Sequence, residues 1–135
     1  IATTGDLVAV IDRAVPKAVR ARGGHPAKRV FQALRIEVND ELGILEGALS
    51  AAVNALRIGG RLAVITFHSL EDRIVKNTLR RLAQGCICPP HTPVCVCGHT
   101  PEVRLVGKAK AAGKEECAAN TRARSAKLRV AEKIK

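Results

Sequence analysis

Apolar residues recur at helical intervals over three stretches in the first part of the chain. The first stretch covers about residues 5–15, with Thr4 as the expected N-cap, and the second covers about 26–38. The third begins at Asn39, repeats leucine and valine every three or four residues, and stops at Gly59-Gly60. The pattern therefore predicts three amphipathic helices.

The next segment, residues 61–67, is continuously apolar rather than alternating. Such a run is typical of a strand that is buried on both faces of a parallel sheet. Ser69 and Asp72 follow it with the spacing of a capping box, which predicts a helix that reaches about Ala83. A helix, a glycine pair, a buried strand and another helix in this order indicate a doubly wound α/β unit.

The last third of the chain has weaker periodicity. Residues 85–101 are rich in glycine, proline and cysteine and show no regular pattern, and residues 108–121 have the composition of a loop. Two short strands are predicted at 103–107 and 125–132. They fit an antiparallel pair at the edge of the sheet.

Composition limits the class of protein. The chain has 135 residues, which is enough for one compact domain at most. Its longest uncharged apolar run, Leu62 to Phe67, is far shorter than the roughly 20 residues that a bilayer crossing needs. The chain has no methionine and no basic leader followed by an apolar stretch, so we expect part of a longer, cytoplasmic protein without a membrane span.

Charge is unevenly distributed along the chain. The formal net charge is +11, of which residues 73–135 carry +10. A concentrated basic field favours phosphate backbones through counterion release, although it also suits an anionic membrane surface or a solvated face without a partner. Because the chain has no tryptophan or tyrosine, an aromatic platform for single strands is not expected.

Four cysteines cluster in two Cys-x-Cys pairs within twelve residues: Cys86, Cys88, Cys95 and Cys97. Two such pairs can provide a tetrahedral, structural Zn²⁺ site, with His91 and His99 as spare ligands. Two disulfides and free thiols remain alternatives, the former disfavoured by the lack of secretory features. Cys117 is isolated, and we expect it to be inert.

Three blocks together resemble one family. They are His25 to Asn39, Gly59 to Arg73 with its Phe-His-Ser-Leu-Glu-Asp-Arg run, and Asn120 to Arg129. In this order they closely resemble the bacterial small-subunit ribosomal RNA cytosine-N4 methyltransferases, and the resemblance extends from Thr4 to Lys133. The cysteine-rich excursion is similar to the version in Gram-positive members.

The resemblance implies the C-terminal part of a class I, Rossmann-like methyltransferase sheet, preceded by the end of a helical insert domain. On that template residues 1–38 end the insert, residues 39–135 belong to the methyltransferase domain, and 85–101 form the cysteine-rich excursion. The implied reaction is S-adenosylmethionine-dependent methylation of a cytosine N4 amine in 16S rRNA of the small ribosomal subunit.

The family's glycine-rich cofactor loop, its acidic ribose ligand and its Asp-Leu-Gly stretch lie upstream of this segment and are missing from it. We therefore expect no cofactor-binding residues here, a requirement for the missing N-terminal half, and little activity of this chain alone. The alternative is a noncatalytic, zinc-organised RNA-binding or ribosome-associated module, to which the basic C-terminal half also points.

Candidate site residues follow the predicted buried strand, because ligands of doubly wound sheets bind at the carboxyl ends of strands. His68, Glu71 and Asp72 are the catalytic candidates. Helix initiation is the competing interpretation for the acidic pair and Ser69, and backbone capping is the competing one for His68. The expected RNA contacts are Arg35, Asn39, Ser69, Arg73, Asn120, Arg122, Arg124 and Ser125.

Overall fold

A computed structural model describes residues 1–20, 24–89 and 92–135 of the chain. The chain divides into two compact units, residues 1–41 and residues 42–135. No helix in the described ranges is long and apolar enough to cross a membrane.

In residues 1–20 and 24–41 of the first unit, all the regular elements are helices. They are α1 (Thr4–Ala14), α2 (Lys17–Arg20) and α3 (Ala27–Val38). The expected N-cap at Thr4 is wrong by one residue: Thr3 caps α1, because its side chain accepts from the Asp6 N–H while the Asp6 carboxylate accepts from the Thr3 N–H at 2.9 Å. Backbone N–H groups of Thr3 and Ala2 hold the pKa of Asp6 below its ordinary value.

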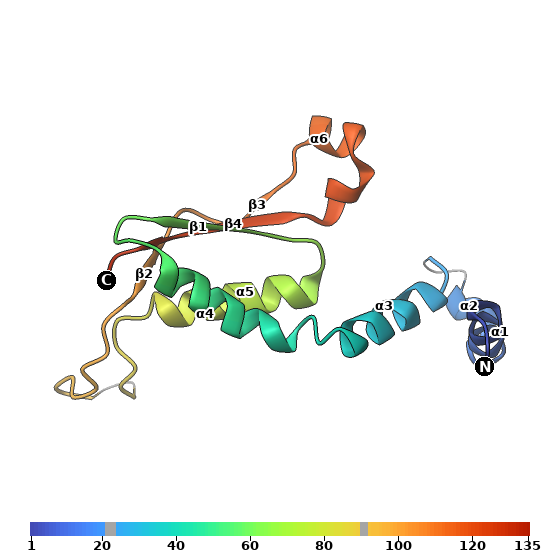
Figure 1. Cartoon of the computed structure of the whole chain (residues 1–135), viewed down its shortest axis with the longest axis horizontal. Coiled ribbons are helices and arrows are strands. Elements are labelled where there is room, and N and C mark those ends of the chain that lie inside the picture. The colour runs from blue at the N-terminus through green and yellow to red at the C-terminus, as the bar shows by residue number, and fades with distance from the viewer. Residues whose placement is uncertain (21–23, 90–91) are drawn as a thin grey trace. The chain divides into compact units, whose positions relative to one another are not determined.

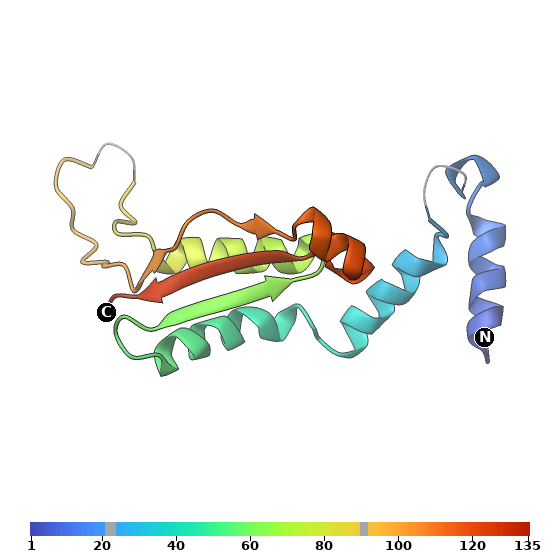
Figure 2. The ribbon, with the colours of Figure 1, turned by 90° about the horizontal axis from the view of Figure 1, so that it is seen from above.

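The second unit is built on a small sheet (Figures 1 and 2). Its strands are β1 (Arg61–Thr66), β2 (Val103–Leu105), β3 (Lys110–Ala111) and β4 (Lys127–Lys133). β4 lies between β1 and β2 and pairs antiparallel with both, so β1 and β2 run in the same direction. The antiparallel pairing of the last strands is confirmed, and β2 is an edge strand as expected. The edge position is wrong for β4, because β4 pairs with β1 as well as β2, and β3 also pairs with it.

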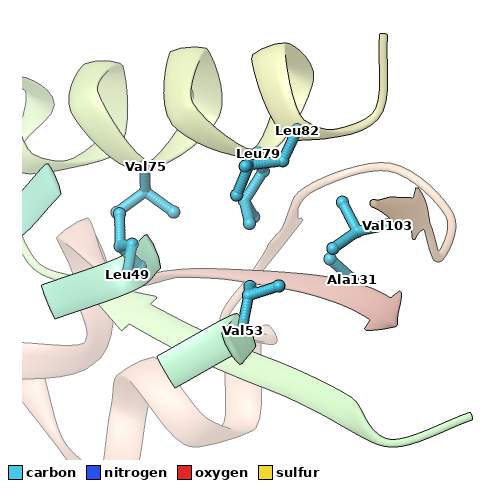
Figure 3. Packing of buried hydrophobic residues seen from close by; sticks show 7 residues of the cluster. All are labelled: Leu49, Val53, Val75, Leu79, Leu82, Val103 and Ala131. Carbon is cyan, nitrogen blue, oxygen red and sulfur yellow. The ribbon is translucent and has the colours of Figure 1, made fainter. Parts of the chain in front are cut away.

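Helices α4 (Gly43–Ala55) and α5 (Ser69–Leu82) pack on the same face of this sheet. Side chains from both helices meet β2 and β4 in the core drawn in Figure 3. The cluster comprises Leu49, Val53, Val75, Leu79, Leu82, Val103 and Ala131. The opposite face is open: Ile65 in β1 is 59% exposed. The prediction that β1 is buried on both faces is therefore wrong for the described residues. All the strand pairings among these residues are antiparallel, whereas a doubly wound unit has mostly parallel pairings.

The bounds of α4 differ from the predicted helix, which began at Asn39. Asp40 has a φ of 48°, a left-handed conformation that interrupts the helical path after α3. At the other end, the Lys133 ammonium group donates to the carbonyl oxygens of Asn54 and Leu56, each at 2.9 Å. These bonds satisfy carbonyls that the end of α4 leaves without helical partners.

The segment predicted as a loop at 108–121 contains β3 and a short helix, α6 (Lys114–Ala119). Two glutamates in the first turn of α6 and its alanines favour a helix that the lack of longer periodicity concealed. A 3₁₀ turn, η1 (Thr121–Ser125), then leads into β4, which begins two residues later than the predicted strand.

Candidate functional site

An open pocket of about 400 Å³ lies where β1 ends and α5 begins. Thr66 closes β1 opposite Lys127, the first residue of β4, and its hydroxyl donates to the Lys127 carbonyl at 3.4 Å. This pairing places the start of β4 beside the start of α5. The pocket is lined by Phe67, His68, Ser69, Asp72, Ser125 and Lys127.

His68 is the N-cap of α5 and forms a reciprocal capping box with Glu71. Its Nδ1 accepts from the Glu71 N–H at 3.4 Å, while Glu71 Oε2 accepts from the N–H groups of Phe67 and His68 at 2.9 and 3.2 Å. The predicted box at Ser69 and Asp72 is therefore wrong by one residue. The acidic residue three positions after the cap His68 is Glu71, and its carboxylate closes the box.

The capping bond also fixes the chemistry of the His68 ring. Because Nδ1 accepts a hydrogen bond, the proton of the neutral ring is assigned to Nε2. Nε2 lies 3.1 Å from Glu71 Oε1, but in a direction that does not form a hydrogen bond. This buried nitrogen thus has no hydrogen-bond partner among the residues that the structure describes.

Asp72 is buried and its carboxylate is held by β4. Arg129 donates to both oxygens, Nε to Oδ1 at 2.7 Å and Nη2 to Oδ2 at 3.1 Å, and Lys127 Nζ donates to Oδ2 at 3.3 Å. The Arg129 bond is the main reason that the pKa of Asp72 lies below its ordinary value, against the opposing effect of burial. Asp72 is therefore an ionised group whose two oxygens are already engaged.

The remaining lining groups are a ring and two hydroxyls. Phe67 is 55% exposed beside His68, and no hydrogen bond of the Ser69 or Ser125 hydroxyl is found within the described ranges. Sequence reasoning named both serines but missed Phe67 and Lys127. Two features of the sequence could have identified Phe67. It directly precedes the candidate His68, and it is one of only two phenylalanines in the chain.

The other predicted RNA contacts are not brought into the pocket lining. Arg73 is exposed on α5, and Arg122 and Arg124 are exposed on η1, just before Ser125. Asn120 caps η1 by accepting from the Arg122 N–H at 3.1 Å. In the sequence, Arg73 follows the lining residue Asp72 directly, and Arg124 directly precedes the lining residue Ser125.

Arg35 and Asn39 belong to the first unit, and both contact Glu41. Arg35 Nε lies 2.9 Å from Glu41 Oε1, and the Asn39 amide donates to the same oxygen at 3.2 Å. Both side chains therefore brace the segment that follows α3.

The open face of the sheet carries a second hollow of about 250 Å³, which includes Ile65 and its β4 partner Leu128. At one end of this face, Glu132 lies between Arg61 at 3.0 Å and Arg104 at 2.7 Å. The Arg61 bond is the main cause that lowers the pKa of Glu132. The face therefore combines exposed apolar side chains with a cross-strand ion-pair triad.

The four clustered cysteines converge in the excursion between α5 and β2. Their Sγ atoms all lie within 4.8 Å of one another, and each cysteine is a free thiol. The structure thus brings together the four residues that the spacing predicted as ligands: Cys86, Cys88, Cys95 and Cys97. His99 is not in this group, and His91 lies outside the described residues.

The electrostatics of the cluster are uneven. Backbone N–H groups of Ile87 and His99 donate to Cys97 Sγ and lower its pKa to about 6. The Cys88 N–H lowers the pKa of Cys86, but the three surrounding thiols raise it more, so that the resulting pKa is about 12. The neighbouring groups thus shift the pKa values of these two thiols in opposite directions.

The pocket does not by itself fit a nucleotide cofactor. The turn from β1 to α5 contains no glycine, so its backbone has no glycine-rich loop to approach a ligand closely. The glycine pair lies at the other end of β1, where Gly59 has a φ of 82° and a Cβ on Gly60 would meet the Arg57 oxygen at 2.8 Å. These glycines serve the α4–β1 turn.

Comparison with known proteins gives a consistent result along the chain. Residues 1–134 match the family described as the MraW methylase family. The chain is 62% identical over 133 residues to a protein of Heliobacterium modesticaldum. This match covers 98% of the chain and 42% of the relative. It is 60% identical over 136 residues to a protein of Desulfovibrio desulfuricans, with 99% of this chain and 42% of the relative covered.

A protein of Clostridioides difficile is 55% identical over 135 residues, with 99% of this chain and 43% of the relative covered. All three relatives are named "Ribosomal RNA small subunit methyltransferase H". The chain thus spans less than half the length of these relatives.

Proposed function

The chain belongs to the MraW methylase family, and we propose that the protein containing it methylates the exocyclic N4 amine of a cytosine in 16S ribosomal RNA. The observation that carries the proposal is the high identity, along nearly the whole chain, to relatives named as small-subunit ribosomal RNA methyltransferases. The proposed substrate is the small ribosomal subunit, and the proposed location of the protein is therefore the cytoplasm.

The proposed fold of the whole protein is a class I, Rossmann-like methyltransferase. In it, residues 39–135 form the C-terminal part of the catalytic domain, with the excursion at 85–101, and residues 1–38 end a helical insert. The open apolar face around Ile65 supports this proposal, because exposed apolar surface of this kind is normally covered. The missing N-terminal half would supply the cover.

S-adenosylmethionine, when bound, supplies an electrophilic methyl group. We propose that the residues of this chain do not form its site, and the glycine-free turn after β1 supports this proposal. We assign cofactor binding to the missing N-terminal half and expect this chain alone to be inactive. What the chain contributes is the position of the RNA base.

The pocket at the end of β1 suits an extruded base. Enzymes that modify a base take it out of its stack into a pocket that reads its edge and covers its face. Here the exposed Phe67 ring and the adjacent His68 ring offer apolar and aromatic surface, and the Ser69 and Ser125 hydroxyls offer acceptors for an exocyclic amine. These groups would hold the amine in line for transfer.

The three catalytic candidates have different proposed roles. His68 lines the pocket, and we assign it the contact with the base through its ring. Glu71 fixes the His68 backbone and ring through the capping box. Asp72 is proposed as a positioning residue that holds Lys127 at the pocket through an ion pair.

Phosphate binding is proposed for arginines that lie close in the sequence to the residues lining the pocket. Arg73, Arg122 and Arg124 are exposed and can reach backbone oxygens, with Asn120 holding the η1 turn that carries the latter two. Arg35 and Asn39 are proposed to contact RNA from the insert or to link it to the catalytic domain.

The test is methyl transfer from labelled S-adenosylmethionine to small ribosomal subunits that lack the modification. The chain alone should give no labelled RNA, whereas the chain joined to the N-terminal part of a relative should label it. Nucleoside digestion and mass spectrometry should then identify N4-methylcytidine. A methyl group on another atom would refute the assignment of the amine.

The alternative, a noncatalytic RNA-binding module, makes a different prediction in the same assay. The chain alone would bind 16S rRNA with a steep dependence on salt, and joining it to the N-terminal part would add no methyl transfer. That result would overturn the enzymatic proposal.

A further inference from the structure

We propose that Cys86, Cys88, Cys95 and Cys97 bind a single zinc ion, which stabilises the excursion between α5 and β2. The proposal rests on the positions of the four sulfur atoms and on the chain around them. It does not depend on the proposed methyl transfer.

The separations of the sulfur atoms fit a tetrahedron around one metal ion. Four of the six sulfur pairs are 3.5, 3.9, 3.5 and 3.8 Å apart, and no pair exceeds 4.8 Å. Zinc binds thiolate sulfur at about 2.3 Å, which gives tetrahedral edges of about 3.8 Å. The thiols are therefore already arranged within a few tenths of an ångström of most of the edges that a bound ion requires.

The same distances argue against other uses of four cysteines. Sulfur atoms in a disulfide lie about 2.05 Å apart in separate pairs, whereas Cys95 here is near Cys86, Cys88 and Cys97 together. A cluster of several irons distributes its thiolates over different metal atoms and needs them farther apart. A closed set of four sulfurs favours zinc and leaves no open position for a substrate.

Backbone N–H groups are directed at these sulfurs. The Cys88 N–H donates to Cys86 Sγ at 3.4 Å, and those of Ile87 and His99 donate to Cys97 Sγ. Such bonds orient ligands and stabilise the negative charge of thiolates. Four thiolates at this spacing repel one another, and a divalent cation offsets that repulsion.

The excursion has little else to hold its shape. Its base is closed by the Glu102 N–H, which donates to the Leu82 carbonyl at 2.8 Å. Beyond that point Ile87, Val94 and Val96 are exposed, so the described residues of the loop form no apolar core. The ion would supply the cross-link that packing does not, as in other small metal-stabilised segments.

The first experiment measures metal in the purified protein, prepared with a reductant that does not bind zinc. We expect one zinc per chain by elemental analysis and native mass spectrometry. Replacement by Co²⁺ should give the intense visible and near-ultraviolet absorption of a tetrahedral sulfur site. Absence of stoichiometric metal after incubation with Zn²⁺ would overturn the proposal, and iron in its place would overturn the choice of zinc.

Serine variants give a matched comparison, because Cys117 lies outside the cluster. Cys86→Ser and Cys97→Ser should weaken zinc binding at least tenfold in competition with a chromophoric chelator, while Cys117→Ser should bind like the parent. Circular dichroism checks that each variant is folded. Equal zinc affinity in all three variants would refute the assignment.

Mass spectrometry of the metal-free protein separates the remaining outcomes. A mass lower by four hydrogen atoms, with no metal uptake, would replace zinc by two disulfides. An unchanged mass with all five cysteine thiols reactive and no metal uptake would leave only free cysteines. Either result would refute the proposal.

Discussion

Asp72 on α5 and Arg129 on β4, 57 positions apart in the chain, form a two-point ion pair with bonds of 2.7 and 3.1 Å. Both side chains are largely shielded from solvent. The pair connects the first turn of α5 to strand β4, and Asp72 itself lines the candidate base pocket. Its loss would therefore affect both stability and the pocket.

Replacing Asp72 by asparagine should lower the free energy of unfolding by about 2 kcal/mol, because Arg129 is left partly buried without its counter-charge. Urea denaturation of the parent and Asp72→Asn measures the difference. Glu46→Gln is the matched control, since the Glu46–Arg81 pair is more than half exposed and should change stability by less than about 0.5 kcal/mol. Equal effects of the two variants would contradict the role given to Asp72.

The contribution of Asp72 should also depend on pH. Its pKa in the folded chain is lower than the ordinary value of 3.8, chiefly through Arg129, so folding favours the ionised form. The stabilisation is complete above 3.8 and is lost as the pH falls through the folded-state pKa. Unfolding curves from about pH 6 to about pH 2 should therefore converge for the parent and Asp72→Asn at the acid end. A constant difference would argue against this linkage.

Leu79 is 1% exposed and lies at the centre of the helix–sheet core (Figure 3). Truncation to alanine should cost about 3 kcal/mol of unfolding free energy, from lost burial and the cavity that remains. Leu70 on the same helix is 42% exposed, and Leu70→Ala should cost about 0.5 kcal/mol. Thermal or urea unfolding of both variants checks the contrast. Similar losses would mean that α5 does not pack on the sheet through Leu79.

Phe67 should matter for methyl transfer more than for folding, because its ring is 55% exposed at the pocket. In the chain joined to its N-terminal part, Phe67→Ala should reduce methylation about tenfold, the effect of losing one base-stacking contact. Ile58→Ala is the control: Ile58 is 73% exposed in the turn before β1, away from the pocket. Steady-state rates on small ribosomal subunits distinguish the two variants. Full activity of Phe67→Ala would remove the ring from the base site.

Removal of the proposed zinc should loosen the excursion without unfolding the core. The Leu82–Glu102 bond and the packing of Val103 close the base of the loop independently of the cysteines. Hydrogen exchange after chelation should therefore rise in residues 86–97 and stay unchanged around Val75. Global unfolding on chelation would show that the core depends on the ion.

The sequence by itself determined the elements with strong local signals. The helical period predicted α1 and α3, and the capping pattern predicted α5, each within about two residues, while the apolar run predicted β1. The Cys-x-Cys spacing identified four groups that the fold brings together, because a short segment with prolines limits how far they can separate. Local chemistry is sufficient where neighbours in sequence are also neighbours in space.

Only the tertiary structure decided which faces and strands meet. A continuous apolar run cannot tell whether one or both faces of β1 are covered, since that depends on where α4 and α5 pack. Likewise, β4 became the central strand through pairing with two segments that are distant in sequence. The partnership of Asp72 with Arg129, and the meeting of Ser69 with Ser125 at one pocket, have the same origin: strand register places side chains together that no local pattern connects.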